Sequence, residues 1–406
     1  MTRKSLITSL DVGTTYVRAI IGEERSPNEI NIIGIGTSPS KGMKEGGIID
    51  LEKTIEAIEH AVEQAERMSG VEVHEVFVNV VASHVNLINN KGVVAVNNED
   101  REITAEDVER VTQAAKVVNL PPDKEIIDVI PHQFIVDGYD GIKDPVGMLG
   151  VRLEVDALIV AGKSTTIHNL LRCVQRAGLE VNDLILSIMA NAETLLSEEE
   201  RKLGVGIIDI GGGTVEIGIF KDGFMECLDS INIGGDYITN DLAVGLKISQ
   251  DEAEKLKIKF GVASPELAED GSVEIFSIGD KEPRQVSIEE VGSIIEPRIR
   301  EIFDFINSRL DEYGYREKLA AGIVITGGVT ELKGLQEIAE QELDANVRIV
   351  KPRLLGVNNP IYSTGVGMIQ YVVNNNYESE YYEEASSGNV SGLFNRIKNW
   401  FLDFFE

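Results

Sequence analysis

Two stretches of the chain share one pattern of hydrophobic and polar positions. In residues 6–21 and again in residues 206–220, a short apolar run leads to an aspartate, a glycine-containing turn follows, and a second apolar run leaves the turn. The pattern predicts a strand, a tight turn and a return strand in each place. Aligning Asp11 with Asp209 superimposes the two turns, with one additional glycine in the second, so we expect two related lobes.

The remaining hydrophobic positions predict alternating helices and strands. Residues 323–332 predict a buried strand that runs into a glycine turn and a helix. In residues 83–162, a helix that begins at the capping sequence from Thr104 lies between strand-like runs, which predicts a small inserted subdomain. Helical spacing is found at residues 51–69, 167–177, 185–200, 251–260 and 288–310, and strand-like spacing at 76–81 and 273–286.

The C-terminal segment has a different character. Residues 374–388 have no apolar period and contain four glutamates, which predicts a flexible acidic linker. The last residues predict an amphipathic helix whose apolar face is rich in aromatic rings, as suits a membrane interface, although such a face can also dock on the protein itself. The predicted membrane face consists of Leu393, Phe394, Ile397, Trp400, Phe401, Phe404 and Phe405.

Composition and charge narrow the classes of function. The chain has 406 residues, 43% of them hydrophobic, and a formal net charge of −30, which argues against nucleic acid as a partner and makes any membrane contact local and hydrophobic. Cys173 and Cys227 are too few for a disulfide framework or a zinc site, and we expect both to be small buried residues. No signal peptide and no spanning apolar run is found, so the protein is expected to stay inside the cell.

Three glycine turns, each following an apolar strand, are the candidate ligand-binding segments of the chain. They lie at Gly13, at Gly211, Gly212 and Gly213, and at Gly327 and Gly328. Such turns let backbone N–H groups approach phosphate oxygens. One turn alone is more often structural, but three of them, two within the repeated hairpins, favour a phosphate site.

The residues beside these turns complete the candidate site. Asp11 and Asp209 would end matching strands in facing lobes, and two such acids suit Mg²⁺ with its waters. The hydroxyls of Thr14, Thr15 and Thr214 can donate to phosphate. Rival nucleotide motifs fail: Ala157 stands where a P-loop ending at residues 162–164 requires glycine, and no dinucleotide fingerprint follows a strand.

These motifs resemble a known superfamily. Residues 11–15, 209–214 and 325–328 resemble the phosphate-1, phosphate-2 and adenosine motifs of the actin-like ATPases, which implies the α/β actin/Hsp70/sugar-kinase (ribonuclease H-like) fold. Within that superfamily, the insert and the tail resemble the bacterial cell-division FtsA family. The matching runs are residues 83–85, 133–138, 144–153 and 295–298.

The resemblance implies roles for several residues. ATP would lie between the lobes with Mg²⁺ near Asp11 and Asp209, and Glu254 and Lys257 would lie near the ribose and adenine, with Gly327 and Gly328 on the purine side. Without the family, Glu254 and Lys257 would be a solvated helical ion pair. Related ATPases position the attacking water with a Glu or Gln where this chain has Ser187, so we expect tight binding and at most slow hydrolysis.

The resemblance also implies a function. Such proteins polymerise on the inner face of the cytoplasmic membrane at the division site, tether the tubulin-like protein FtsZ by its C-terminal tail and help recruit later division proteins. Arg298 and Arg300 are the candidates for meeting the acidic FtsZ tail, although surface solvation is the alternative role for both. Two rival functions are a small-molecule kinase of the same superfamily and a pilus-assembly adaptor.

With the resemblance, the chain divides into segments of two lobes. The expected order is lobe 1 core (1–82), inserted subdomain (83–162), lobe 1 core (163–203), lobe 2 core (204–248), small lobe 2 subdomain (249–303), lobe 2 core (304–358), return to lobe 1 (359–373), acidic linker (374–389) and membrane-targeting helix (390–406).

Overall fold

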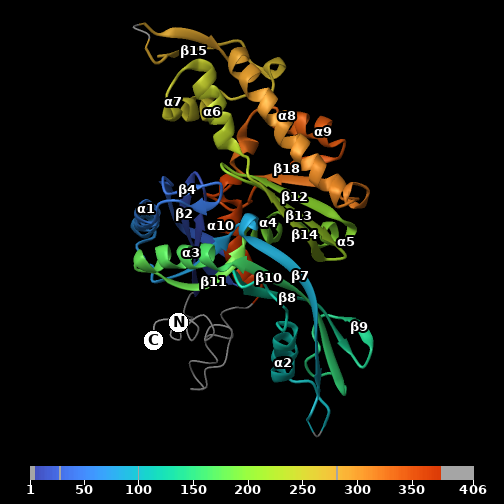
Figure 1. The fold of residues 1–406 in the computed structure, drawn as a ribbon. Coiled ribbons are helices and arrows are strands. Elements are labelled where there is room, and N and C mark those ends of the chain that lie inside the picture. Colours follow the sequence, from blue (N-terminus) through green and yellow to red (C-terminus); the bar gives the residue numbers. More distant parts are fainter. Residues whose placement is uncertain (1–4, 27–28, 99, 280–281, 376–406) are drawn as a thin grey trace. The chain divides into compact units, whose positions relative to one another are not determined.

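The computed structural model describes residues 5–26, 29–98, 100–279 and 282–375 (Figure 1). Its contacts separate two compact units: Met1–Ser83 with Leu171–Glu406, and His84–Leu170. The predicted linker from residue 376 onwards and all seven predicted membrane-facing residues lie outside the described residues. In the part of the chain that is described, none of the helices is long and apolar enough to cross a membrane.

The first sheet of the larger unit has the strand order β11-β6-β1-β2-β3. Three strands of this sheet are antiparallel: β1 (Ser5–Val12), β2 (Tyr16–Ser26) and β3 (Glu29–Pro39). On the other side of β1 lie two strands parallel to it, first β6 (Glu75–Val80) and then β11 (Glu180–Leu186). Helix α1 (Leu51–Ser69) packs on β2 and β3, and α10 (Ser363–Asn374) packs on β1, β2 and α4 (Ser187–Leu195). A short hairpin, β4 (Met43–Lys44) and β5 (Gly47–Ile48), precedes α1.

The second sheet repeats this design. Its order is β14-β13-β12-β17-β18, with β12 (Val205–Ile210), β13 (Val215–Lys221) and β14 (Phe224–Ile231) antiparallel and β17 (Ile323–Thr326) and β18 (Val347–Ile349) parallel to β12. In both lobes the first strand of the hairpin therefore pairs antiparallel with the second and parallel with a later strand. The duplication predicted from the two glycine turns is confirmed.

One apolar core joins the second sheet to its helices. It includes side chains of α6 (Gly235–Leu246), α7 (Gln250–Phe260), α8 (Ile288–Glu312) and α9 (Leu335–Leu343). Burial of such apolar area stabilises the fold by roughly 25 cal/mol per Å². A hairpin of β15 (Ser272–Ile275) and β16 (Arg284–Ser287) and the 3₁₀ turns η2 (Pro265–Leu267), η3 (Arg316–Lys318), η4 (Gly328–Glu331) and η5 (Pro360–Tyr362) complete this part.

Two predicted helices differ from the structure in their limits. The single helix expected over 185–200 is wrong: Ile185 and Leu186 end β11, α4 ends at Leu195, and α5 (Glu198–Leu203) is a separate helix. The break occurs because Ser197 caps α5 through a capping box with Glu200, and a cap requires extended backbone. The helix expected directly after the turn at Gly327 is a 3₁₀ turn, and α9 begins only at Leu335.

The smaller unit is an antiparallel sheet with one helix. Its order is β7-β10-β8-β9, formed by β7 (Val85–Ala95), β8 (Lys124–Val136), β9 (Tyr139–Ile142) and β10 (Arg152–Lys163). Helix α2 (Ala105–Ala115) begins at the predicted cap, where Thr104 and Asp107 form a capping box. The turn η1 (Ala82–His84) and helix α3 (Ser164–Arg176) are the chain connections to the larger unit.

Candidate nucleotide-binding site

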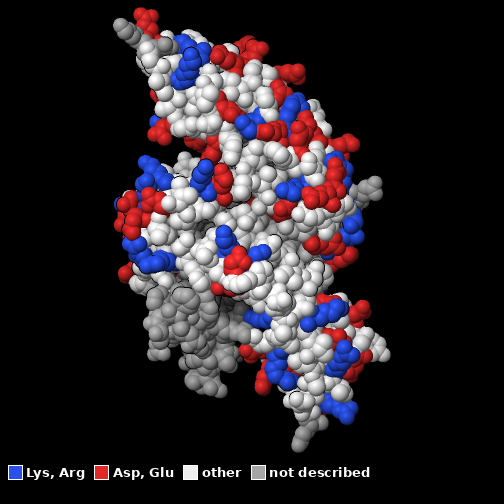
Figure 2. All heavy atoms as spheres, viewed as in Figure 1, with Lys and Arg blue, Asp and Glu red and all other residues white. Residues whose placement is uncertain are grey.

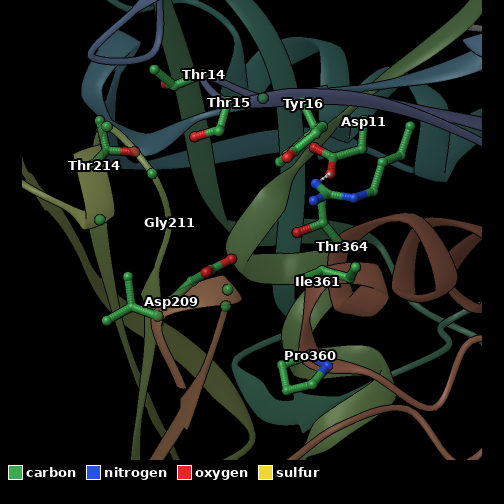
Figure 3. Close-up of a pocket in the computed structure, with 18 of the residues that line it drawn as sticks. Asp11, Thr14, Thr15, Tyr16, Asp209, Gly211, Thr214, Pro360, Ile361 and Thr364 are labelled. Atoms are coloured by element: carbon green, nitrogen blue, oxygen red, sulfur yellow. Dashed lines mark ion pairs between the residues drawn. The ribbon is translucent and has the colours of Figure 1, made fainter. Parts of the chain in front are cut away.

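A cavity of about 520 Å³ lies within the larger unit, between its two sheets (Figure 3). All thirteen residues predicted to bind nucleotide line this cavity. They come from the two hairpin turns, from α7 and from the turn after β17: Asp11, Gly13, Thr14, Thr15, Asp209, Gly211, Gly212, Gly213, Thr214, Glu254, Lys257, Gly327 and Gly328. The fold therefore brings together residues that lie up to 317 positions apart in the sequence, from 11 to 328.

The two hairpin turns predicted to hold phosphate, residues 11–16 and 209–214 and hereafter the phosphate turns, have the same local geometry and touch each other. The N–H of Gly13 donates to the carbonyl of Tyr16 at 3.1 Å, and the N–H of Gly211 donates to the carbonyl of Thr214 at 2.9 Å. A Cβ at Gly212 would overlap the Thr15 hydroxyl, so only glycine allows the two turns to approach this closely.

The two predicted metal-binding aspartates have different partners. Arg18 Nη1 lies 3.6 Å from Asp11 Oδ2, and Asn191 donates to Asp209 Oδ2 at 2.7 Å. The dashed line at Asp11 in Figure 3 marks its ion pair. Burial raises the pKa of Asp11 despite the Arg18 charge. Burial, with a smaller contribution from the Asp11 charge, raises the pKa of Asp209 to about 6.

Glu216 is a third acid of the site, which was not predicted from the sequence. It lies opposite Asp209 in the β12–β13 register and its residue is 4% exposed. Its Oε1 accepts from the N–H of Ala82 at 2.7 Å, and its buried Oε2 has no hydrogen-bond partner among the described residues. Burial and the charges of Asp209 and Asp11 raise the pKa of Glu216 to about 8. The signal was present in the sequence, since an acid within an otherwise apolar strand is rarely buried without a role.

The donor set fits a hydrated divalent cation beside phosphate. Two buried acids, Asp11 and Glu216, and the partly buried Asp209 line the cavity beside the guanidinium of Arg18, so acids outnumber the basic groups at this end of the site. Over the described ranges, no cluster of three metal-ligating side chains is close enough to hold an ion directly. Mg²⁺ usually keeps several waters and binds through one or two carboxylates and the phosphates, which suits acids that reach the ion through water.

Glu254 and Lys257 are not a solvated ion pair. Their side chains are 23% and 11% exposed, and their charged atoms lie 2.7 Å apart. Lys257 Nζ also donates to the Gly235 carbonyl at 2.9 Å and to the Thr239 hydroxyl at 2.8 Å. The pair therefore joins α7 to the start of α6 at the cavity wall.

Apolar side chains line the cavity near Gly327 and Gly328. Gly327 has φ of 95°, and a Cβ there would overlap Asp209 Oδ1, so the turn requires glycine. Ile258, Leu332 and Ile361 line the same cavity. Ile258 is 66% exposed, so its side chain is accessible from the cavity and could contact an apolar part of a ligand. These three residues were not predicted from the sequence, because each looks like an ordinary core position.

Ser187 lines the cavity with its hydroxyl already engaged. It accepts from Asn79 Nδ2 and donates to the Val80 carbonyl, both at 3.3 Å. The Asn79 side chain in turn accepts from the N–H of Val12 at 2.7 Å and so fixes the end of β1. Because this hydroxyl already accepts one hydrogen bond and donates another, and is no carboxylate, it is a poor acceptor for the proton of an attacking water.

Arg298 and Arg300 lie on α8, outside the cavity. Arg298 pairs with Asp241 at 2.7 Å and with Glu301, and its guanidinium lies 5.5 Å from the centre of the Tyr237 ring. Arg300 pairs with Glu296 at 2.7 Å and with Glu342. Figure 2 shows acidic and basic side chains interspersed over the region where Figure 1 places α8. Any acidic peptide at these arginines must compete with acids of the chain itself.

Family models and individual proteins of similar sequence all indicate the same family. The family model described as "Cell division protein FtsA" matches residues 206–367, and that described as "SHS2 domain inserted in FTSA" matches residues 82–161. The chain is 43% identical over 376 residues to the cell division protein FtsA of Bacillus subtilis (strain 168), covering 92% of this chain and 85% of that protein. It is 33% identical over 413 residues to that of Escherichia coli (strain K12), covering 98% of both.

Solved structures with lower identity share the fold. The PilM-PilN type IV pilus biogenesis complex contains a chain with a TM-score of 0.63 and 15% identity, covering 90% of this chain and 98% of that one. MreB 5 of Spiroplasma citri bound to AMPPNP has a TM-score of 0.55 and 15% identity, covering 96% and 100%. At this identity the two similarities show the actin-like fold alone, whereas the curated relatives are similar in sequence over nearly the whole chain. The chain belongs to the FtsA family of actin-like cell-division proteins.

Proposed function

We propose that this chain binds ATP with Mg²⁺ in the cavity between its two sheets. The observation that carries the proposal is that all thirteen predicted residues line one cavity, whose lining includes the glycine turns of both hairpins and the acids Asp11, Asp209 and Glu216. MreB 5 of Spiroplasma citri, which has the same fold, is bound to AMPPNP, and this supports a nucleotide as the ligand.

Turnover of the nucleotide is proposed to be slow. Ser187, at the position where related ATPases have Glu or Gln, cannot act as a general base, and its hydroxyl is bonded to Val80. The protein would then use the nucleotide chiefly to set conformation and self-association. Phosphate release as fast as that of an active chaperone or sugar kinase would contradict this part.

Membership of the FtsA family supports the role in division. The protein would polymerise on the inner face of the cytoplasmic membrane, tether the FtsZ ring and help recruit later division proteins. The predicted helix at 390–406 would anchor it. One such helix has an affinity on the order of micromolar to millimolar for lipid, whereas a polymer gains avidity.

The FtsZ tail is proposed to bind the small subdomain that carries α8. An acidic peptide would replace Glu301 on Arg298 while Asp241 keeps its own bond to the same guanidinium. The side chain of Glu301 is 45% exposed and that of Asp241 is 25% exposed, so Glu301 is the easier partner to displace. Arg298 would thus stay oriented by Asp241 when a peptide binds.

The two rival functions have less support. A sugar-type kinase needs a base and a substrate-recognition set, and neither could be identified from the sequence. The pilus-assembly adaptor shares the fold at 15% identity, while the FtsA relatives share 33% and 43% of their residues with this chain.

Sedimentation with liposomes tests the membrane part of the proposal. The full chain and a chain ending at Gly388 would be compared with and without ATP and Mg²⁺. We expect only the full chain to sediment with lipid, and more of it with ATP. If neither chain sediments, the terminal helix is not the anchor and the kinase alternative gains weight.

A further inference from the structure

The first turn of α6 is fixed to the second-lobe phosphate turn. The N–H of Gly235 donates to the Gly211 carbonyl at 2.9 Å, and the N–H of Asp236 donates to the Gly212 carbonyl at 2.8 Å. The start of this helix therefore moves with the phosphate turn of its own lobe. Its side chains at Asp236 and Tyr237 are held at the seam between the lobes.

These two consecutive side chains reach the other lobe. The Thr15 hydroxyl donates to Asp236 Oδ1 at 3.1 Å, and the Tyr237 hydroxyl donates to Glu45 Oε1 at 3.3 Å. Asp236 thus holds the first phosphate turn directly. Thr15 has one hydroxyl proton, so it cannot donate to phosphate while it donates to Asp236.

Glu45 connects Tyr237 to the second threonine of the same turn. Glu45 and Gly46 form the turn between β4 and β5, both with positive φ, of 49° and 77°. The N–H of Gly46 donates to the Thr14 hydroxyl at 2.9 Å. Both threonines of the first phosphate turn, labelled in Figure 3, are therefore held by one turn of α6, one of them directly and the other through this hairpin.

We infer that Asp236 and Tyr237 are positioning residues that clasp the first phosphate turn against the second and so slow the release of bound nucleotide. They act through Thr15 and through Glu45, and need not touch the nucleotide. The contact between Gly212 and Thr15 lies beside the clasp, so opening it separates the two turns that enclose the phosphates. The inference rests on the proposed nucleotide site.

Tyr237→Phe removes only the hydroxyl that donates to Glu45, so it tests the contribution of that hydrogen bond. The phenyl ring remains, and with it the stacking of Arg298, whose guanidinium lies 5.5 Å from the ring centre. Glu45→Ala removes the acceptor, whereas Glu45→Gln keeps an oxygen that can accept from Tyr237. Tyr139→Phe is the matched control, because Tyr139 belongs to the smaller unit and is 78% exposed.

The measurement is the rate at which excess ATP displaces a fluorescent ATP analogue from the full chain in Mg²⁺. Tyr237→Phe and Glu45→Ala should each speed release by about threefold to tenfold, the effect of one lost hydrogen bond. The double variant should release no faster than either single variant, because both remove the same bond. Glu45→Gln and Tyr139→Phe should behave as the wild type, and melting of the nucleotide-free chain should change little.

A second pair of variants tests Asp236 independently. Asp236→Ala removes the acceptor of the Thr15 hydroxyl and should speed release, whereas Asp236→Asn keeps an oxygen that can accept and should release at the wild-type rate. Wild-type release rates in Tyr237→Phe and in Asp236→Ala would overturn the clasp while leaving the nucleotide site intact, as would rates that multiply in the Tyr237→Phe, Glu45→Ala double variant. If the wild-type chain binds no ATP analogue at all, the proposed function fails and the clasp fails with it.

Discussion

Glu216 lies directly opposite Asp209 across the β12–β13 hairpin, so two acids face each other beside the second phosphate turn. At the equivalent place in the first lobe, Asp11 lies opposite Arg18. The duplicated hairpins therefore differ in charge where they meet the cavity. The second hairpin places two acids opposite each other where the first pairs an acid with a guanidinium, and this difference has consequences that can be measured.

The first consequence is a pH dependence of stability. The pKa of Glu216 is raised to about 8 and that of Asp209 to about 6, above the ordinary values of 4.5 and 3.8 for these acids. A raised pKa means that the folded chain binds protons that the unfolded chain has lost, so stability is greatest below the unfolded pKa and falls as pH rises through the folded pKa. The nucleotide-free chain should lose stability between about pH 5 and pH 8, by at most about 1.4 kcal/mol per pH unit for one group.

Glu216→Gln separates the contribution of Glu216 to the pH dependence of stability from the contributions of the other titratable groups. The amide imitates the protonated acid, so the variant should be more stable than the wild type at pH 8 and similar to it at pH 5 in urea unfolding. Glu56→Gln, at an exposed position of α1, is the control and should leave the pH profile unchanged. Parallel profiles of wild type and Glu216→Gln would show that this acid is ionised in the folded chain.

The second consequence concerns proton release on binding. A divalent cation near Asp209 and Glu216 favours their charged forms, so Mg²⁺ and ATP together should expel protons from the site at pH 7. Calorimetric titration in two buffers of different ionisation enthalpy measures the number released. We expect release in the wild type and less of it in Glu216→Gln, whereas equal heats in both buffers would argue against a cation at these acids.

A third prediction concerns the arginines of α8. Reversal of both Arg298 and Arg300 to Glu should abolish binding of an FtsZ C-terminal tail peptide, measured by fluorescence anisotropy. Because Asp241 would then face another acid, the double variant needs a melting curve beside it. Glu301→Gln is the sharper companion: it removes the acid that competes for Arg298 and should tighten peptide binding a fewfold. Unchanged affinity in both variants would remove these arginines from the binding site.

The sequence predicted the parts of the site that carry a local signature. Gly13, Gly211 and Gly327 follow apolar strands, and the hairpin repeat alone relates Asp11 to Asp209. Asn191 and Asp236 were missed because they contact the site only when separate elements fold against each other. Glu216 was missed although an acid within an otherwise apolar strand is a local signal, because it can also be taken for the polar half of an alternating strand.

Element limits were predicted where a cap was visible in the sequence. Helix α1 runs over the predicted residues, with Asp50 as its N-cap and Gly70, with φ of 72°, at its C-terminus. The break between α4 and α5 was missed, because Ser197 and Glu200 form a capping box inside a run that otherwise has helical spacing. The helical spacing of apolar residues predicts one continuous helix there, whereas the capping box predicts a new helix start, and the structure follows the capping box.

Calorimetric titration of ATP and Mg²⁺ into the full chain, beside Gly212→Ala and Gly271→Ala, tests the central claim most directly. A Cβ at Gly212 would overlap the Thr15 hydroxyl and force the two phosphate turns apart, whereas the nearest atom to a Cβ at Gly271 is 3.7 Å away. The nucleotide site described here predicts tight binding to the wild type and to Gly271→Ala, and a loss of at least tenfold, about 1.4 kcal/mol, in Gly212→Ala. Equal ATP affinity in all three chains, or no binding to the wild type, would contradict it.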